Sequence, residues 1–544
     1  MSRLPCLLPT SAKRPDDHDS VVFAVYAPFG TDPVLSGFPD NKRKSIRRYP
    51  LIKHLLDVAR QGVHVSALVD LRHDDTYLIE IPAFEPRAMV IHSAWKQCMS
   101  APQALAGFLR RTRQRFPCST LVLALEGHGA GYLPEIDGSL ITPHSTSGGG
   151  TVEWRIGGGS SEPVDAGTGA PVLGVAVYPE LPVESPEVLT LSLPMSTWAL
   201  GFALRSAVKD GVPRPAVIHF NNCFNMSVEV LHTVAPHADF ATGYANYNFF
   251  TAGETYPAVF KALRQQFAST GPVSREQLAR WFAQKNGALL NAKKNHPSVG
   301  ATIALRRLSG VSAALDDLAK ELTDALKSAG GSGVRDRIKA AVSAAQQYDT
   351  EQGFQLQVPD QLTDLADFAV QLMQQFASGA IHDKAGKLAK ALANTWQYGD
   401  LDRPHVDETQ IWDFRNQRLG VNIFFPDPGI EGLWDWRSPY YMKNTLASEA
   451  HKPPAQGGVI DFLSDSSGRS PWVKFLIEYH RVTVNPPRIV LLRAKPALFP
   501  IFDRAFKPKY PHPDPREPGQ GSPGQTPPSD PYGGGGSGPA GRTS

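Results

Sequence analysis

The fold of this chain is decided by residues 214–231, which read Arg-Pro-Ala-Val-Ile-His-Phe-Asn-Asn-Cys-Phe-Asn-Met-Ser-Val-Glu-Val-Leu. The short, mostly apolar run at 216–220 follows two prolines and predicts a buried strand. Two asparagines end the run, and a helical pattern begins near Ser227. Cys223 is therefore expected between a strand and a helix, where unpaired N–H groups and the helix dipole favour a thiolate. A lone cysteine is more often buried and unreactive, so a catalytic role requires a second feature.

Apolar strand-like runs alternate with helical patterns through the first half of the chain. The runs lie at 21–26, 63–71, 121–125 and 216–220, and the helical patterns lie at 51–60, 102–115 and 193–208. Strands that are apolar throughout are typical of a parallel sheet covered on both faces. We therefore expect an α/β fold with a mostly parallel sheet sandwiched by helices. Helical stripes dominate after about residue 260, so the C-terminal region is expected to be largely helical, with a late strand at 421–425.

Composition divides the chain into four expected parts. These are a flexible N-terminal tail at 1–19, a catalytic domain at 20–260, a helical C-terminal region at 261–495 whose late strand packs on the core, and a disordered Pro- and Gly-rich tail at 496–544. From Lys507 onward there are almost no aliphatic side chains to bury. A Pro-rich tail of this kind is also a candidate for binding partners in an extended form.

Charge and cysteine content narrow the class of protein. The formal net charge of +3 is nearly balanced over 544 residues, and the basic cluster at 42–48 is too short to indicate a nucleic-acid surface. Four cysteines without a CxxC pair make no disulfide framework, so we expect a reducing, cytoplasmic compartment. No apolar run approaches the roughly 20 residues that cross a bilayer, and the N-terminal run is a poor signal peptide. We expect neither a nucleic-acid nor a membrane partner.

His128 and Cys223 each follow the carboxyl end of a predicted parallel strand. Ligands of open parallel sheets bind outside these ends, and neighbouring strands can bring together residues that are 95 positions apart (223 − 128). A thiolate attacks a carbonyl carbon while an imidazole handles the proton. The N–H groups of Gly129 and Cys223 are candidates for the oxyanion hole. We therefore predict a Cys–His catalytic dyad.

Other polar residues fit this chemistry less well. His219 precedes Cys223 by four positions, about 13 Å along an extended strand, so it is expected to be a packed strand residue. A metal site made by Cys223, His232 and His237 would lack recognisable ligand spacing. The Gly-rich stretch at 139–170 lacks the GK[ST] of a phosphate-binding loop and is expected to be a long loop, either disordered or functional. We expect no metal and no cofactor.

Several segments resemble the clostripain family of caspase-like cysteine peptidases (family C11, clan CD). The segments that carry the resemblance are Leu121 to Tyr132 with its His-Gly pair, Asn221 to Val230 around the cysteine, Ala238 to Phe240, Gly253 to Tyr256, Thr363 to Phe368, and Leu419 to Pro426. They follow one another in the order of the family, and the resemblance covers roughly residues 20–480. The resemblance implies a caspase-like fold and an endopeptidase with Cys223 as the nucleophile and His128 as the general base.

Two positions depart from the pattern of that family. The resemblance implies an acidic residue two positions before the cysteine that helps to bind a basic P1 side chain, and this chain has Asn221 there. A buried guanidinium requires a carboxylate, so Asn221 is a substrate-binding candidate that leaves the P1 preference open. Glu126 and Gly127 replace the Asn/Trp-type residues before the His-Gly pair. Glu126 either orients His128 or points to solvent, and we favour the second. Glu229 matches a family position and is expected to be structural.

The predicted function is hydrolysis of peptide bonds in protein or peptide substrates. The resemblance also implies processing between the two catalytic residues, for which Arg155 is a candidate cleavage point in 139–170. Calcium use is implied by the resemblance alone, since no EF-hand loop is present. Two alternatives remain open: a catalytically silent caspase-like scaffold, and a Cys–His acyl transferase or ligase that uses the same dyad.

Overall fold

The computed structural model describes most of two long regions and several shorter segments. The described residues are 5–6, 20–29, 46–70, 76–92, 99–127, 129, 131–134, 141–145, 152–156, 195–246, 248, 251–294, 300–348, 362–398, 420–425, 441, 459–465, 468–481 and 490–493. His128 and the tail at 496–544 lie outside them.

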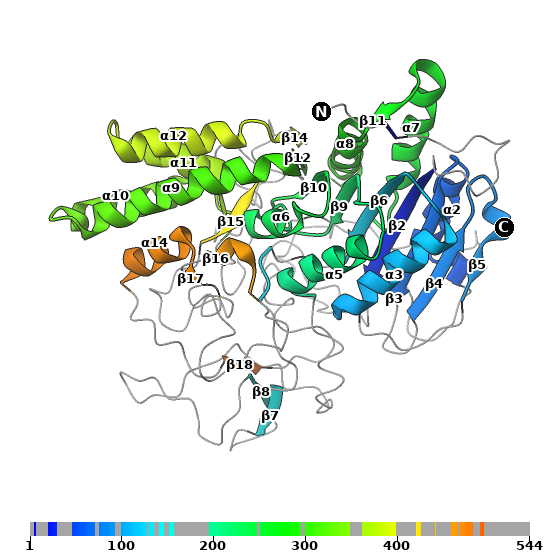
Figure 1. Ribbon diagram of the computed structural model, residues 1–544, viewed down its shortest axis with the longest axis horizontal. Coiled ribbons are helices and arrows are strands. Elements are labelled where there is room, and N and C mark those ends of the chain that lie inside the picture. Colours follow the sequence, from blue (N-terminus) through cyan, green and yellow to red (C-terminus); the bar gives the residue numbers. More distant parts are fainter. Residues whose placement is uncertain are drawn as a thin grey trace, which may run out of the picture.

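A nine-stranded sheet forms the centre of the molecule (Figure 1). Its strands, in spatial order, are β14 (Trp396–Tyr398), β12 (Gly300–Ala304), β10 (Phe240–Tyr244), β9 (Val217–Asn221), β6 (Thr120–Glu126), β2 (Val21–Pro28), β3 (His64–Asp70), β4 (Thr76–Ile81) and β5 (Val90–Ile91). The five strands from β10 to β3 are mutually parallel, and the outer strands pair antiparallel. Numbered along the chain, the parallel strands have the order 2-1-3-4-5, which is a doubly wound arrangement.

Helices cover both faces of this sheet (Figure 1). One face carries α2 (Pro50–Ala59), α7 (Tyr256–Thr270) and α8 (Arg275–Lys294), and the other carries α3 (Pro102–Arg115), α5 (Thr197–Lys209) and α6 (Val228–Val234). Odd-numbered residues of β2 pack in the first core and residues 22, 24 and 26 pack in the second. Successive strand side chains point to opposite faces, so a strand that is apolar throughout contributes buried side chains to the cores on both faces of the sheet. The predicted α/β class is confirmed.

The C-terminal region is largely helical, as the sequence predicts. Its helices are α9 (Leu308–Lys327), α10 (Gly331–Ala344), α11 (Leu365–Gln375), α12 (Ala380–Leu392) and α14 (Pro471–His480), and α14 packs on α9. The late strand is β15 (Asn422–Phe424), which pairs antiparallel with β13 (Leu362–Asp364). Figure 1 shows α9 to α12 extending away from the sheet on the side of β12 and β14.

Several expectations require correction. The 139–170 stretch contains β7 (Ile141–Ser145) and β8 (Val152–Ile156), which pair with each other, and β8 also pairs with β18 (Val490–Arg493). The expected loop therefore includes a hairpin. Two residues of the expected N-terminal tail form β1 (Pro5–Cys6), which pairs with β11 (Val273–Ser274). Because β12 and β14 follow residue 260, the sheet draws on both sides of the expected boundary, and the four-part division stays a prediction.

The remaining elements are short. They are β16 (Ser464–Asp465), β17 (Gly468–Arg469) and the 3-10 turns Ile46–Arg48, Pro86–Ala88, Leu305–Arg307 and Asp461–Leu463. Within the described segments, no helix is both long enough and apolar enough to cross a membrane.

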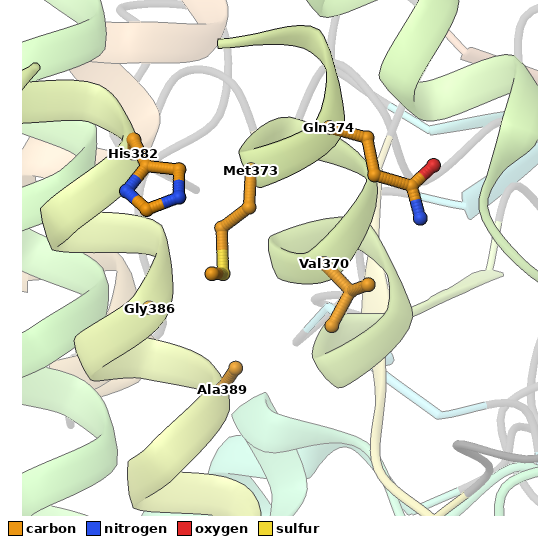
Figure 2. Close-up of a pocket in the computed structure, with 6 residues that line it drawn as sticks. All are labelled: Val370, Met373, Gln374, His382, Gly386 and Ala389. Atoms are coloured by element: carbon orange, nitrogen blue, oxygen red, sulfur yellow. The ribbon is translucent and has the colours of Figure 1, made fainter. Parts of the chain in front are cut away.

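A hollow of about 430 Å³ lies between α11 and α12 (Figure 2). It is lined by Val370, Met373, Gln374, His382, Gly386 and Ala389. None of the residues predicted for catalysis lines this hollow. Met373 is partly buried and packs against the hydrophobic core, and Phe376, three residues later, is buried in that core.

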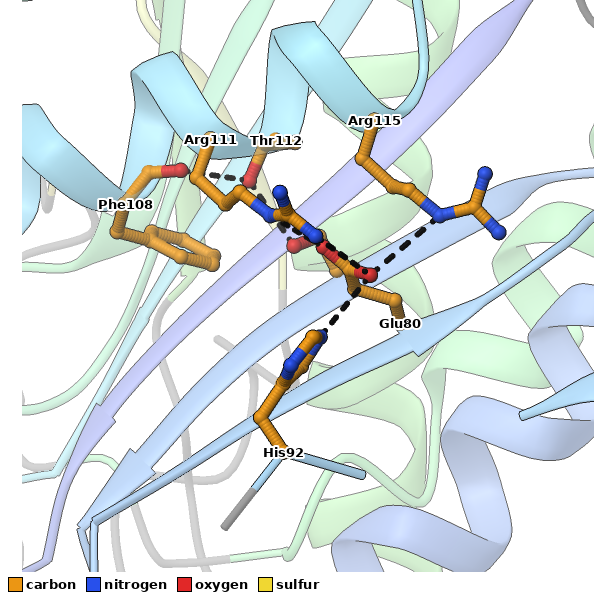
Figure 3. Close-up of polar contacts among 7 residues, drawn as sticks. Glu80, His92, Phe108, Arg111, Thr112 and Arg115 are labelled. Carbon is orange, nitrogen blue, oxygen red and sulfur yellow. Dashed lines mark hydrogen bonds and ion pairs between the residues drawn. The ribbon is translucent and has the colours of Figure 1, made fainter. Parts of the chain in front are cut away.

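Helix α3 is joined to the edge of the sheet by a buried carboxylate (Figure 3). Arg111 donates from Nε and Nη2 to the two oxygens of Glu80, at 2.9 and 3.3 Å. Arg115 lies 3.4 Å from the same carboxylate, and His92 Nε2 lies 3.1 Å from it. Arg111 and Arg115 stay more than one-third exposed, and their partner Glu80 lies in β4, about 30 residues earlier in the chain.

Candidate active site

The carboxyl ends of β6 and β9 lie side by side, as predicted. Glu126 is paired with Asn221 in their parallel register. A Cβ atom added to Gly129 would lie 2.1 Å from the Cys223 carbonyl oxygen and 3.0 Å from the Asn222 side chain. Only glycine fits at such a contact. The second residue of the His-Gly pair is therefore packed directly on the residue that carries the thiol.

A second contact joins these two loops. Gly131 has a φ of 66°, in the left-handed region that favours glycine. Its N–H donates to Asn225 Oδ1 at 3.1 Å, and Asn225 Nδ2 donates to Asn222 Oδ1 at 2.8 Å. Residues 222–227, which we call the cysteine loop, are thereby hydrogen-bonded to the glycine-rich turn after β6. His128 directly precedes Gly129 in the sequence and lies outside the described residues.

Cys223 is a nearly buried thiol, 8% exposed. Its Sγ lies 3.3 Å from both the main-chain nitrogen and the carbonyl oxygen of Asn248. The N–H of Asn248 donates to sulfur, and a protonated sulfur donates to the carbonyl. The N–H group favours the thiolate and the carbonyl oxygen favours the protonated thiol, so Asn248 offers a main-chain partner to the sulfur in either protonation state.

The helix after Cys223 begins where the sequence predicts, directly after Ser227. Its first residue is Val228, five positions after the cysteine, and the Ser227 hydroxyl caps it by accepting from the Val230 N–H at 3.3 Å. The field of a helix end falls off within about one turn. The expected stabilisation of a Cys223 thiolate by this helix is therefore wrong, and the contact with Asn248 lies in its place.

Glu126 is buried, so the expectation that it points to solvent is wrong. It is 2% exposed, and it accepts from Asn221 Nδ2 at 3.0 Å and from the Tyr256 hydroxyl. Glu126 ends β6 on the face that α7 covers, and Tyr256 is the first residue of α7. Burial raises the pKa of Glu126 to about 7, and the hydrogen bonds from Tyr256 and Asn221 oppose the rise.

Asn221 is held at both ends of its amide. Besides donating to Glu126, it accepts from Asn248 Nδ2 at 2.9 Å, and it is only 4% exposed. Asn248 Oδ1 in turn accepts from Asn286 Nδ2 of α8 at 3.1 Å. We call this chain of Tyr256, Glu126, Asn221, Asn248 and Asn286 the amide network. The substrate-binding role of Asn221 stays a prediction.

On the opposite face, Glu229 is fully buried and structural in its contacts, as expected. Its oxygens accept from the Ser227 hydroxyl at 2.8 Å, the Phe424 N–H at 2.9 Å and the Tyr441 hydroxyl at 2.7 Å. Burial raises the pKa of Glu229, while these hydrogen bonds lower it. The sequence analysis missed Asn422 and Tyr441, since both follow the cysteine by about 200 residues and no local pattern connects them to it.

His219 is a packed strand residue, as predicted. It is fully buried, with its ring centroid 4.8 Å from that of Phe282 and 5.9 Å from that of Tyr256. Burial lowers the pKa of His219 to about 3. Among the residues that the structure describes, no group of three or more His, Cys, Asp or Glu side chains is arranged to hold a metal ion.

No family model matches this chain, and no curated protein matches it. Solved structures do show similarity. A secreted C11 cysteine protease from Bacteroides thetaiotaomicron, in complex with an irreversible peptide inhibitor, is 16% identical with a TM-score of 0.47, covering 78% of this chain and 96% of that one.

Two further structures name the same family. The secreted C11 protease "iotapain" from Bacteroides thetaiotaomicron is 12% identical (TM-score 0.44; 76% of this chain, 95% of that one). An inactive zymogen C11 protease from Parabacteroides distasonis is 12% identical (TM-score 0.45; 78% of this chain, 95% of that one). C11 is the family that the sequence motifs resemble. One fold hosts many activities, so the activity must be inferred from the residues of the site.

The expected cytoplasmic location is contradicted, because two of these similar structures are of proteases described as secreted. The expectation rested on four cysteines without a disulfide framework. A chain that needs no disulfide folds in oxidising and reducing compartments alike. Cysteine content therefore does not distinguish the two, and we withdraw the expectation.

Proposed function

We propose that this chain is a cysteine endopeptidase in which Cys223 is the nucleophile and His128 is the general base. The observation that carries the proposal is the packing of Gly129 against the carbonyl of Cys223, which leaves no room for a Cβ atom. The His-Gly pair and the cysteine come from two parallel strands whose carboxyl ends are neighbours. This edge is where doubly wound sheets bind their ligands.

In the proposed reaction, the thiolate of Cys223 adds to the carbonyl carbon of the scissile peptide bond. His128 takes the thiol proton and passes it to the leaving amine, and water then hydrolyses the thioester. The N–H groups of Gly129 and Cys223 are proposed to hold the oxyanion. The Asn248 N–H, 3.3 Å from Sγ, is a hydrogen-bond donor for the thiolate once the proton has left.

Labelling with a library of peptidyl electrophiles tests this proposal. Wild type is expected to be labelled at Cys223, and Cys223→Ala and His128→Ala should lose labelling by about 100-fold or more. Cys118 serves as an internal control, because burial raises the pKa of its thiol to about 12. Equal labelling of all three proteins would contradict the proposal and favour the silent scaffold.

The same experiment extends to the other open questions of the site. The best-labelling peptide reports the P1 preference, which the amide of Asn221 leaves open. A hydrolase and an acyl transferase form the same thioester, so products are compared with and without an added amine acceptor. A dominant amide product would favour the transferase or ligase.

We also propose processing between the two catalytic residues. Arg155 is the candidate cleavage point, although it lies in β8 and pairs with Thr142 and Leu491 on either side. Cleavage there requires this pairing to open, since proteases cut exposed, unpaired segments. Mass spectrometry of purified wild type should show a nick that Cys223→Ala lacks. An intact wild type with full activity would contradict the proposal.

The proposed chemistry uses a thiol and an imidazole and calls for no cofactor. Activity is expected to be unchanged after dialysis against EDTA. A loss of activity that Ca²⁺ restores would contradict this expectation and support the calcium use that the family resemblance implies. Protein or peptide substrates are the partners proposed, and partner binding by the Pro-rich tail stays a prediction.

A further inference from the structure

We propose that Asn422 is a positioning residue for Cys223. Its side-chain amide, 198 positions after Phe224 in the sequence, ties the cysteine loop to the loop that follows β10. The part of this inference that concerns turnover rests on the proposed function. The part that concerns the reactivity of the thiol does not.

The amide of Asn422 joins two separate loops. Its Nδ2 donates to the carbonyl oxygen of Phe224 at 3.0 Å and to that of Ala245 at 2.7 Å. Its main-chain N–H donates to the carbonyl of Met226 at 2.9 Å. The side chain is fully buried, so water cannot replace the amide as a hydrogen-bond donor when it is removed. The two carbonyl oxygens would then lack a partner, which lowers the stability of the folded state.

The two carbonyls matter because of what lies beside them. Phe224 follows Cys223 directly and has a φ of 59°, a conformation that a residue with a side chain keeps only where its surroundings hold it. Its N–H donates to Asn246 at 3.0 Å and its carbonyl accepts from Asn422. The peptides on both sides of this unusual residue are therefore fixed by hydrogen bonds.

The loop after β10 carries the main-chain partner of the sulfur. It continues from Ala245 to Asn248, whose N–H and carbonyl lie 3.3 Å from Cys223 Sγ. Asn422 is bonded both to the residue after Cys223 and to this loop. It therefore sets the spacing between the cysteine and the groups that surround its thiol.

Asn422 is itself held rigidly. It pairs with Asp364 in the β13–β15 ladder and forms a bridge with Ser227. Two residues on, the Phe424 N–H donates to Glu229, which also accepts from Tyr441. Figure 1 shows β15 beside α6. The C-terminal region thus reaches the cysteine loop through a strand that is anchored on both sides.

A merely structural residue and a positioning residue predict different results. Loss of any buried hydrogen-bonding side chain lowers stability. Only a positioning residue also changes how fast the cysteine reacts and how that rate depends on pH. These changes must exceed those in a variant that is destabilised at another position. The test therefore compares thiol reactivity in variants of Asn422 with that in a destabilised variant of a neighbouring buried residue.

The experiment measures alkylation of Cys223 by iodoacetamide in the full chain, between about pH 5 and 9. Asn422→Asp keeps the shape of the side chain and loses both N–H donors. We expect its alkylation rate at pH 7 to fall about tenfold or more, with the pH profile moved to higher pH. In the peptidase assay, kcat should fall while KM changes little.

The matched control is Ile423→Val, the neighbouring residue in β15. Ile423 is fully buried and pairs with Thr363, so loss of one methylene lowers stability without touching the cysteine loop. This variant should alkylate like wild type. Asn422→Ser keeps one hydrogen-bond donor and is expected to give an intermediate alkylation rate. If Asn422→Asp does not fold, this variant tests the positioning role.

Wild-type rates and pH profiles in Asn422→Asp and Asn422→Ser would overturn the proposal. A measurement on wild type alone gives a second test: the Phe224 and Met226 amides, which donate to Asn246 and Tyr244, should exchange hydrogen as slowly as those of β9. Exchange at the rate of an exposed loop would also overturn it. If wild type alkylates at Cys223 but cleaves no peptide, the proposed function fails while this comparison still decides the role of Asn422.

Discussion

Two buried carboxylates lie on opposite faces of the sheet beside the cysteine loop, and they are held differently. Glu126 and Glu229 are each at most 2% exposed, and each accepts a hydrogen bond from a tyrosine, Tyr256 and Tyr441 respectively. The other partner of Glu126 is the side chain of Asn221. Glu229 accepts instead from a hydroxyl and from the main-chain N–H of a second strand.

The two carboxylates therefore hold different parts of the protein: Glu229 holds a main-chain group, whereas Glu126 holds only side chains. Glu229 fixes the backbone of β15, and with it the strand that carries Asn422. Glu126 fixes only side chains, which can rearrange or exchange roles. We infer that Glu229 maintains the architecture of the site, whereas Glu126 determines the charge next to the Asn221 side chain. Four predictions test this comparison.

The largest effect is expected for Glu229→Ala. This change leaves two hydroxyls and one main-chain N–H without their buried acceptor, so we expect a loss of about 4 kcal/mol in the free energy of unfolding. Glu126→Ala leaves one amide and one hydroxyl, for a loss of about 2 kcal/mol. Urea denaturation measures both. An equal or larger loss of stability for Glu126→Ala would contradict the view that Glu229 maintains the architecture of the site and Glu126 does not.

The next effect is a pH dependence of stability caused by Glu126. Burial raises the pKa of its carboxyl from the ordinary 4.5 to about 7 in the folded protein. Below pH 4.5 the carboxyl is protonated in both states and its contribution is fully present. As the pH rises through 7, the folded state loses that contribution.

Glu126→Gln mimics the protonated carboxyl and removes this loss. Relative to wild type, the variant should gain about 3 kcal/mol in unfolding free energy between about pH 4.5 and 8. Asp364, whose pKa burial also raises to about 7, is present in both proteins, so its contribution cancels. Parallel pH profiles for the two proteins would show that Glu126 does not titrate near neutrality.

A smaller effect is expected from exchanging the acid and the amide across the two strands. Asn221→Asp sets two carboxyl groups within hydrogen-bond distance, so above pH 7 it should cost about 2 kcal/mol. The double variant Glu126→Gln/Asn221→Asp restores one acid and one amide and should recover most of that loss. Additive losses in a double-mutant cycle would contradict the view that these two side chains form one adjustable pair.

The smallest effect comes from a third buried carboxylate, which serves as a control. Glu80 is held by Arg111 and Arg115 far from the cysteine in sequence. Both arginines are more than one-third exposed, so Arg115→Ala should cost only about 0.5–1 kcal/mol. Alkylation of Cys223 should be unchanged in this variant. A changed alkylation rate would mean that stability alone governs thiol reactivity.

The layered fold could be predicted from the sequence because the patterns that indicate its strands and helices lie within short stretches of the chain. The runs that became β2, β6 and β9 are mostly apolar, and Pro102–Arg115 has both a starting proline and an amphipathic pattern. Strands β10 and β12 were not recognised, since glycine, alanine and threonine dilute their apolar pattern. Short strands of this composition are identified by the neighbours that they pair with, which a single sequence does not display.

The site was predictable only where it depends on strand ends. The meeting of the His-Gly turn with Cys223 follows from two parallel strands. The burial of Glu126 does not, because a glutamate at the end of an apolar run usually reaches solvent. Its burial depends on Tyr256, 130 residues later in the chain. The contacts of Asn422 are equally non-local, so sequence reasoning had no pattern from which to infer them.

The central claim is that Cys223 and His128 together cleave peptide bonds. The most direct measurement is the digestion of a diverse peptide library, with new termini identified by mass spectrometry, by wild type, Cys223→Ala and His128→Ala. We expect new termini from wild type alone, with a common residue or residue class at P1. No cleavage by folded wild type, or cleavage that persists in Cys223→Ala, would contradict it.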